Sequence, residues 1–178
     1  LDGLRALNEM NFREVGDPET HTRIQQYELA FRMQSSVPDL AAITSEPEAT
    51  YELYGEDARK PGTFANTALL ARRLVERDVR FVQVYHNNWD THSNVGGRLP
   101  SQCKDVDQAC WGLIQDLKQR GLLEDTLVIW GGEFGRTPRV QWEPPWSGGR
   151  NHYGKVFCSV LAGGGFKQML VDSGVGNA

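Results

Sequence analysis

The sequence has little of what several common classes of protein require. It contains only three cysteines among 178 residues, at spacings that fit neither a disulfide framework nor a zinc finger. No apolar stretch reaches the length needed to cross a bilayer, so we expect no membrane span. Lys and Arg form no run, and the formal net charge is -4. A surface that follows a phosphate backbone needs an excess of basic residues, so we expect no nucleic-acid partner.

Motifs of several enzyme classes are also missing. The sequence has no Gly-x-Ser-x-Gly element for a nucleophilic serine, and the glycines at 163–165 lack the spacing of a phosphate-binding or dinucleotide-binding loop. Cys110 and Cys158 lie in apolar patterns, which predicts buried thiols rather than a catalytic cysteine. The first residues show neither an initiator Met nor a signal-peptide pattern, so we expect a fragment or a processed form.

The spacing of apolar residues predicts helices in the first part of the chain. We expect helices over residues 1–10 and 20–33, a short one over 45–55, and a fourth after Gly62. Ile24, Tyr27 and Phe31 recur at helical spacing and are expected to be buried. We interpret residues 1–178 as one α/β domain, an incomplete part of a larger hydrolase domain. It would comprise a helical portion at 1–77, a βαβ portion with a metal site at 78–166, and a tail at 167–178.

The pattern changes after residue 78. Residues 79–85 are β-branched and aromatic and predict a strand, followed by a polar loop over 87–100. An amphipathic helix is expected over 101–119, ended by Gly121, and further strands over 126–130 and 156–161. Because strand, helix and strand with short loops form a βαβ unit, we predict a mostly parallel sheet with flanking helices. Ligands of such sheets bind beyond the carboxyl ends of the strands.

Candidate metal ligands lie at these predicted strand ends. Asp90 and His92 follow the first strand, and Glu133 follows the second. Mixed oxygen and nitrogen ligands suit zinc, manganese or iron better than magnesium. Each residue also has an ordinary structural interpretation, because an Asp-x-His pair can hydrogen-bond within its loop and Glu133 can pair with Arg136. The convergence of the two acidic motifs favours a metal site or another polar active site.

His152 precedes the last predicted strand instead of following it. It can join Asp90 and His92 only if the strand at 156–161 is antiparallel to its neighbours, and we predict that it is. The alternative is a hydrogen bond within the glycine-rich segment 148–154. For His21 and His86 we favour structural hydrogen bonds over metal ligation.

Three segments together resemble a known family. They are Asn88-Trp89-Asp90-Thr91-His92, the run from Asp116 to Val128, and Gly132-Glu133-Phe134-Gly135-Arg136-Thr137-Pro138. They are similar to the domain-of-unknown-function family 1501, exported bacterial proteins related to sulfatases and alkaline phosphatases. The resemblance extends over residues 1–166 and implies the carboxyl-terminal portion of an alkaline-phosphatase-like fold.

The resemblance also implies a chemistry. Asp90, His92 and His152 would hold one divalent metal ion (zinc, manganese or calcium), Glu133 would belong to a second metal site, and Arg136 and Arg150 would bind substrate. The activity implied is hydrolysis of a phosphate or sulfate ester, of a small molecule or a polysaccharide, by an exported protein. The nucleophile would come from an amino-terminal part that this chain lacks.

Two departures from the family pattern favour another function. Phe134 stands where related proteins place a second ligand, and Asn151-His152-Tyr153 keeps a single histidine. Both departures would suit a non-catalytic binding or scaffold protein with a degenerate hydrolase fold.

Overall fold

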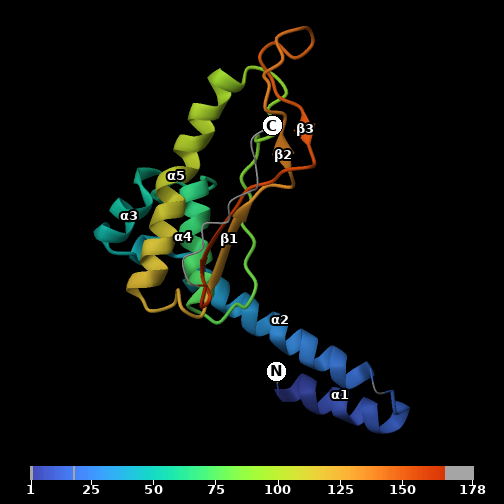
Figure 1. Cartoon of the computed structure of the whole chain (residues 1–178). Helices are drawn as coiled ribbons and strands as arrows, with labels where there is room; N and C mark the ends of the chain where they lie inside the picture. Colours follow the sequence, from blue (N-terminus) through green and yellow to red (C-terminus); the bar gives the residue numbers. More distant parts are fainter. Residues whose placement is uncertain (1, 18, 167–178) are drawn as a thin grey trace. The chain divides into compact units, whose positions relative to one another are not determined.

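A computed structural model describes residues 2–17 and 19–166, and the chain divides into two compact units, Leu1–Ile43 and Thr44–Ala178. The first unit consists of helices α1 (Asp2–Val15) and α2 (Glu19–Ala41) (Figure 1). The Arg5 guanidinium joins them by donating from Nε and Nη2 to the Glu28 carboxylate, at 2.8 and 2.7 Å. The predicted burial of Tyr27 and Phe31 is wrong, because these side chains are 75% and 51% exposed.

The helical layer of the second unit holds most of the apolar core. It consists of α3 (Glu48–Tyr54), η2 (Glu56–Arg59), α4 (Phe64–Val75) and α5 (Val95–Gln119). The short helix η1 (Ile43–Ser45) includes the last residue of the first unit and the first two of the second. The buried apolar side chains of this layer are Tyr51, Tyr54, Ala58, Ala65, Ala68, Leu69, Ala71, Val106, Ala109 and Leu117. At Gly112 an added Cβ would lie 2.7 Å from the Leu53 carbonyl oxygen, so this glycine permits α5 to lie close to α3.

Local capping explains where these helices begin and end. The Thr63 hydroxyl accepts a hydrogen bond from Asn66 N at 3.2 Å and caps α4. The Asn94 side chain accepts from Gly97 N in the same way, so α5 begins at Val95, inside the segment predicted to be a loop. Its last residue, Gln119, agrees with the prediction, and Gly121 follows with a left-handed backbone (φ 71°).

A network of charged side chains is buried in the helical layer. The Arg72 side chain is 2% exposed and pairs with Glu46 at 2.6 Å, Glu76 at 2.5 Å and Asp116 at 2.8 Å. Arg120 binds the same Asp116 carboxylate at 2.6 Å, and Arg73 binds Glu46. Because every one of these carboxylates faces a guanidinium, the network satisfies charges that would otherwise be costly to bury.

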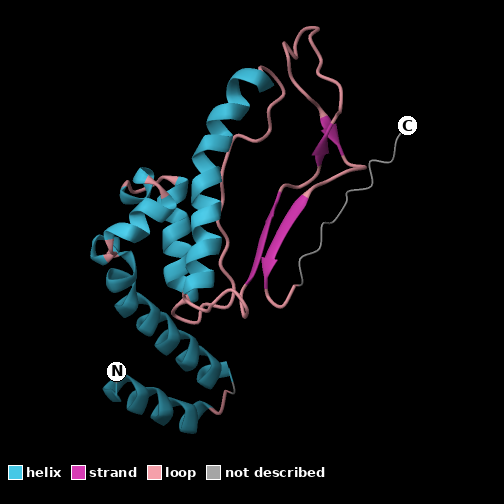
Figure 2. Ribbon diagram, turned by 60° about the vertical axis from the view of Figure 1, so that its left-hand side comes forward, coloured by secondary structure: helices cyan, strands magenta, loops and turns pink. Residues whose placement is uncertain are grey.

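The strands of the described residues form two small antiparallel sheets, so the predicted mostly parallel sheet is wrong. Strand β1 (Leu127–Gly131) pairs antiparallel with β4 (Ser159–Gly163), with Ile129 opposite Leu161. Strand β2 (Gly135–Arg136) pairs antiparallel with β3 (His152–Tyr153). Figure 2 shows the helices of the second unit on one side and these strands on the other. The fold of the described residues is therefore mainly helical, and the alkaline-phosphatase-like sheet architecture is not observed.

Residues 79–85 explain the failure of the βαβ prediction. The segment is extended, and Val82 and Val84 are half-buried while Phe81 and Tyr85 are 80% and 73% exposed. This alternation is that of a strand, yet no strand within residues 19–166 pairs with it. The strand predicted at 79–85 is therefore wrong, because side chains with strand propensity form a strand only with a hydrogen-bonding partner.

The remaining predictions concern the last strand, Cys158, the tail and a membrane span. The strand predicted at 156–161 forms three residues later than expected, and its antiparallel direction is confirmed. Cys158 is exposed, so its predicted burial is wrong. The tail predicted at 167–178 lies outside the described residues. Among the helices that are described, none combines the length and the apolar character needed to cross a membrane.

Candidate metal centre

The structure brings together three of the four predicted metal ligands. Asp90 Oδ1 lies 3.1 Å from His92 Nδ1 and 2.9 Å from His152 Nε2. One ligand atom from each of the three residues lies within 4.8 Å of the other two. Asp90 and His92 come from the loop that precedes α5, whereas His152 comes from β3. Their proximity is therefore a property of the tertiary fold, which joins positions about 60 residues apart.

The positive charge of Arg136 faces the negative charge of Asp90 in this cluster. Its Nη1 lies 2.5 Å from Asp90 Oδ1, and its side chain is 17% exposed. The hydrogen bond from His152 contributes most to lowering the pKa of Asp90; partial burial opposes this, and Arg136 adds to it. Asp90 is therefore held as a carboxylate, the form that binds a cation.

Glu133 lies beside the cluster rather than within it. Its Oε1 is 3.6 Å from Arg136 Nη2, and its side chain is 61% exposed. This is the ion pair that the sequence offered as the ordinary interpretation of Glu133. Phe134, the next residue, packs its ring against His152 with 4.6 Å between the ring centroids. Glu133 and Asp90 thus share one guanidinium, and Phe134 provides an apolar wall for the cluster.

The Arg150 guanidinium binds backbone carbonyl groups. Its Nε donates to the Thr137 carbonyl at 2.5 Å and its Nη2 to the Arg136 carbonyl at 3.4 Å. These bonds hold together the β2 and β3 segments that carry Arg136 and His152. Of the two predicted substrate-binding arginines, Arg136 is the one whose guanidinium faces the cluster.

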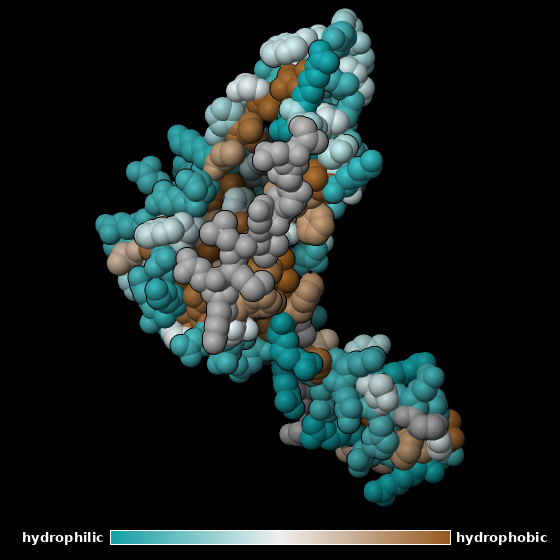
Figure 3. Space-filling model, viewed as in Figure 1, coloured by the Kyte–Doolittle hydropathy of each residue, from teal (hydrophilic) through white to brown (hydrophobic). Residues whose placement is uncertain are grey.

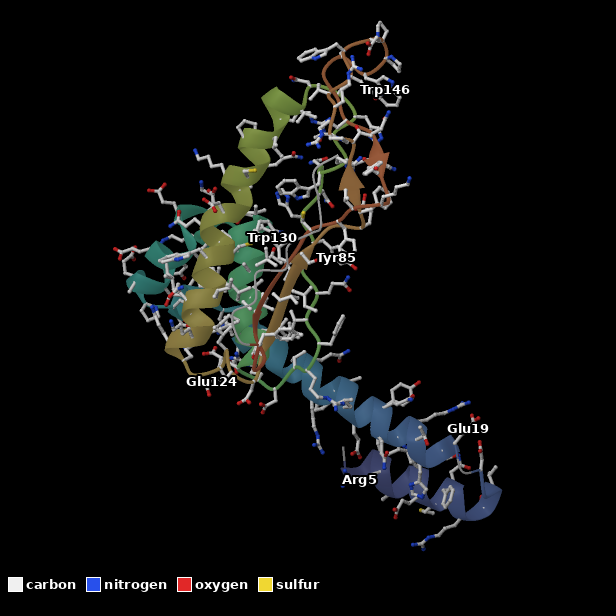
Figure 4. The ribbon with its side chains drawn as sticks, in the orientation of Figure 1. Arg5, Glu19, Tyr85, Glu124, Trp130 and Trp146 are labelled. Atoms are coloured by element: carbon white, nitrogen blue, oxygen red, sulfur yellow. The ribbon has the colours of Figure 1, made fainter. Side chains whose placement is uncertain are left out.

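Aromatic side chains border the two histidines. The His92 ring lies 4.8 Å from the His152 ring and 5.6 Å from the Trp146 ring, centroid to centroid. Trp146 belongs to the loop between β2 and β3, labelled at the top of Figure 4. The contact of this proline-containing loop with His92 was not predicted from the sequence. The only available signal was the position of Trp146 six residues before His152.

The donor set fits a divalent transition-metal ion. One carboxylate and two imidazoles form a frequent ligand set of zinc, and atoms bound to one zinc at about 2.0–2.1 Å lie at most about 4 Å apart. The separations here, up to 4.8 Å, exceed that limit, so the three side chains would have to move closer together around a bound ion. Side chains that are 34% to 58% exposed at His92, His152 and Asp90 leave the cluster accessible from solvent.

The fold and this cluster define a largely helical protein with a candidate aspartate–histidine metal centre. The chain belongs to the family described as protein of unknown function DUF1501, whose family model matches residues 1–171. The predicted membership of family 1501 is thereby confirmed, whereas the relation to sulfatases and alkaline phosphatases stays a prediction. No curated protein matches the chain, and no solved structure matches it.

Proposed function

We propose that Asp90, His92 and His152 bind a divalent metal ion and that the protein takes part in the hydrolysis of a phosphate or sulfate ester. The observation that carries the proposal is the convergence of one carboxylate and two imidazoles, from the loop before α5 and from strand β3, within 4.8 Å. A hydrogen-bonded Asp–His pair within one loop is common, whereas a second histidine from a distant segment on the same carboxylate oxygen favours a ligand set.

The metal supplies one part of the proposed chemistry and the protein supplies the rest. A bound divalent ion would stabilise the negative charge that develops on the ester oxygens during hydrolysis. Asp90 would balance the charge of the ion, and the two histidines would fix its place. Phe134 and Trp146 would limit the access of water on the sides where they pack against the histidines.

Arg136 is the residue proposed to bind the anionic group of the ester. Its guanidinium already binds the Asp90 carboxylate, so it is both close to the cluster and oriented toward it. A planar guanidinium matches two oxygens of a phosphate or sulfate as it matches a carboxylate. A metal ion on Asp90 would compete with this ion pair and leave the guanidinium donors available to an incoming anion.

The decisive experiment compares two aspartates that each lie beside a histidine. Asp90→Asn removes a proposed ligand, whereas Asp105→Asn alters an exposed carboxylate 3.7 Å from His86, outside the cluster. We expect elemental analysis after dialysis against zinc or manganese to find metal in the unaltered protein and in D105N, but not in D90N. With water as the attacking nucleophile and nitrophenolate as the leaving group, cleavage of the nitrophenyl phosphate or sulfate ester should follow the metal content and stop on chelation.

A second candidate function is metal-dependent binding without turnover. The observation in its favour is the ring of Phe134, which packs on His152 and offers no ligand atom to a second metal ion. Stoichiometric metal without hydrolysis of either ester would support this function over the first. An unaltered protein that binds no divalent metal would contradict both.

A further inference from the structure

The loop that carries Asp90 and His92 is joined by backbone hydrogen bonds to residues 147–150, which precede His152 and are called the glycine loop below. Three such bonds connect the two loops, namely Arg150 N to Thr91 O at 3.3 Å, Asn94 N to Ser147 O at 3.2 Å, and Val95 N to Gly148 O at 2.9 Å. The two loops form no sheet with each other, and these backbone hydrogen bonds hold them together instead. They fix the ligand loop against the segment that leads directly to His152.

Gly149 is the point of closest approach between the two loops. An added Cβ there would overlap the carbonyl group of His92 and lie 2.7 Å from Ser93 N. These are backbone atoms, so no side-chain rotation can relieve the overlap. The residue is buried and its φ angle is not left-handed, so the requirement for glycine is one of space alone.

Gly149 is also held from its other side. Its N–H donates to the Gln141 carbonyl at 3.2 Å, and its own carbonyl accepts from Gln141 N at 2.9 Å. Asn151 continues this arrangement, because its side-chain amide donates to Gln141 Oε1 at 2.5 Å. The glycine loop therefore cannot simply move away from His92 without breaking bonds to residue 141.

Thr137 fixes the segment between Gly149 and His152. Its hydroxyl accepts a hydrogen bond from Asn151 N at 3.1 Å, and its N–H donates to the Asn151 carbonyl at 2.8 Å. Asn151 immediately precedes His152, which pairs with Arg136 across the β2–β3 sheet. The spacing between His92 and His152 is thus set by Gly149 on one side and by Thr137 on the other.

We propose that Gly149 is a positioning residue of the metal centre, and that Thr137 is a second positioning residue, which holds Asn151 beside His152. Gly149 allows the backbone of His92 to lie against the glycine loop, which holds His92 and Asp90 opposite His152. The ligand whose binding depends on it is a divalent cation, and the inference rests on the function proposed above. A side chain at position 149 would separate the two loops and open the ligand set.

Gly149→Ala tests the proposal, with Gly154→Ala as the matched control. Gly154 lies two residues beyond His152, and an added Cβ there meets nothing within 4 Å. In the 178-residue chain, zinc affinity measured by competition with a chromophoric chelator should fall about 10- to 100-fold in G149A. The visible absorption of bound cobalt(II) should change with it, because the spectrum reports the geometry of the ligands. Both readouts should stay unchanged in G154A.

Thr137→Val provides a milder test in case G149A does not fold. Loss of the hydroxyl acceptor should weaken zinc binding by about fivefold, the effect of one hydrogen bond, and Thr137→Ser should restore it. Far-UV circular dichroism would establish that the helical layer is intact in each variant. Zinc affinity and a cobalt spectrum in G149A equal to those of the unaltered protein would overturn the inference, as would T137V with unaltered affinity. Absence of metal from the unaltered protein itself would overturn the proposed function, and this inference with it.

Discussion

The helical layer and the strand region of residues 44–178 differ in how much apolar surface they bury. Leu69 and Leu117 in the helices are at most 1% exposed, whereas Ile129 on β1 and Val160 on β4 are 65% and 50% exposed. Figure 3 shows hydrophobic atoms at the surface over the strand-bearing part of this unit. The stability of the unit therefore resides mainly in the helical layer.

The two regions also treat their charges differently. Arg72 in the helical layer is almost fully buried and surrounded by carboxylates, whereas the Asp90 side chain is 58% exposed. The buried charges are part of the structure, because removing one of them leaves an excess of the opposite charge in the buried network. The charges of the candidate site are accessible, which is what a ligand requires. We expect substitutions in the two regions to affect different properties.

The largest loss of stability should follow from breaking the buried network. Arg72→Met removes the guanidinium that pairs with Glu46 and Asp116, so only Arg73 and Arg120 remain to balance three carboxylates, Glu46, Glu76 and Asp116. We expect the free energy of unfolding, from urea titration, to fall by about 3–5 kcal/mol. Arg59→Met, at an exposed ion pair with Glu48, is the control and should change it little. Equal effects of the two substitutions would refute the contrast between buried and exposed charges.

A smaller but still large effect should follow from truncating the helical core. Leu69→Ala creates a cavity at a fully buried position and should cost about 2–5 kcal/mol. Ile129→Ala removes a similar side chain from a position that is 65% exposed and should cost much less. Thermal unfolding of the two variants measures the difference directly. If Ile129→Ala proved as costly as Leu69→Ala, the apolar face of β1 would have to be covered in solution.

Acid should weaken the helical layer through Glu46. Burial raises the pKa of this carboxyl, but the hydrogen bonds from Arg72 and Arg73 outweigh it, and the folded-state pKa lies below the usual 4.5. A lowered pKa contributes stability that is present above the unfolded-state value and is lost as the pH falls through the folded-state value. We therefore expect urea midpoints to fall as the pH decreases below about 4.5. Glu46→Gln should reduce this slope, and an unchanged slope would exclude Glu46 as its source.

Local signals were sufficient to predict most of the helical layer, but not the start of α5 at Val95. The short helix after Pro47, the helix after Gly62 and the end of α5 before Gly121 follow from capping residues and from 3.6-residue periodicity. The strand β1 was also predicted, from its β-branched and apolar residues. These signals act over a few residues, so they do not depend on contacts with distant parts of the chain.

Sheet pairing and the site could be predicted only in part, because both depend on distant contacts. Residues 79–85 have strand character, but pairing is not encoded within the segment itself. Glu133 was expected near Asp90 because both were predicted to follow parallel strands. The parallel sheet is absent from the described residues, and Glu133 contacts Arg136. The prediction for His152 depended on an antiparallel strand, which is present. What brings His152 to Asp90 is the set of loop hydrogen bonds around Gly149, for which a pair of glycines was the sole signal.

The smallest change in stability should come from the centre of the candidate site. Asp90→Asn keeps an oxygen that can accept the hydrogen bond from His152 and loses only the charge that attracts Arg136. Because the Asp90 side chain is mostly exposed and lies outside the helical core, the urea midpoint of the metal-free protein should not move measurably. Added zinc should raise the midpoint of the unaltered protein, because a ligand that binds only the folded state stabilises it, and should leave D90N unchanged. A metal-free D90N that unfolds as readily as the Arg72 variant would show that Asp90 is a structural residue. In that case the candidate site would contribute to stability as the helical layer does, and the two regions would not differ in this respect.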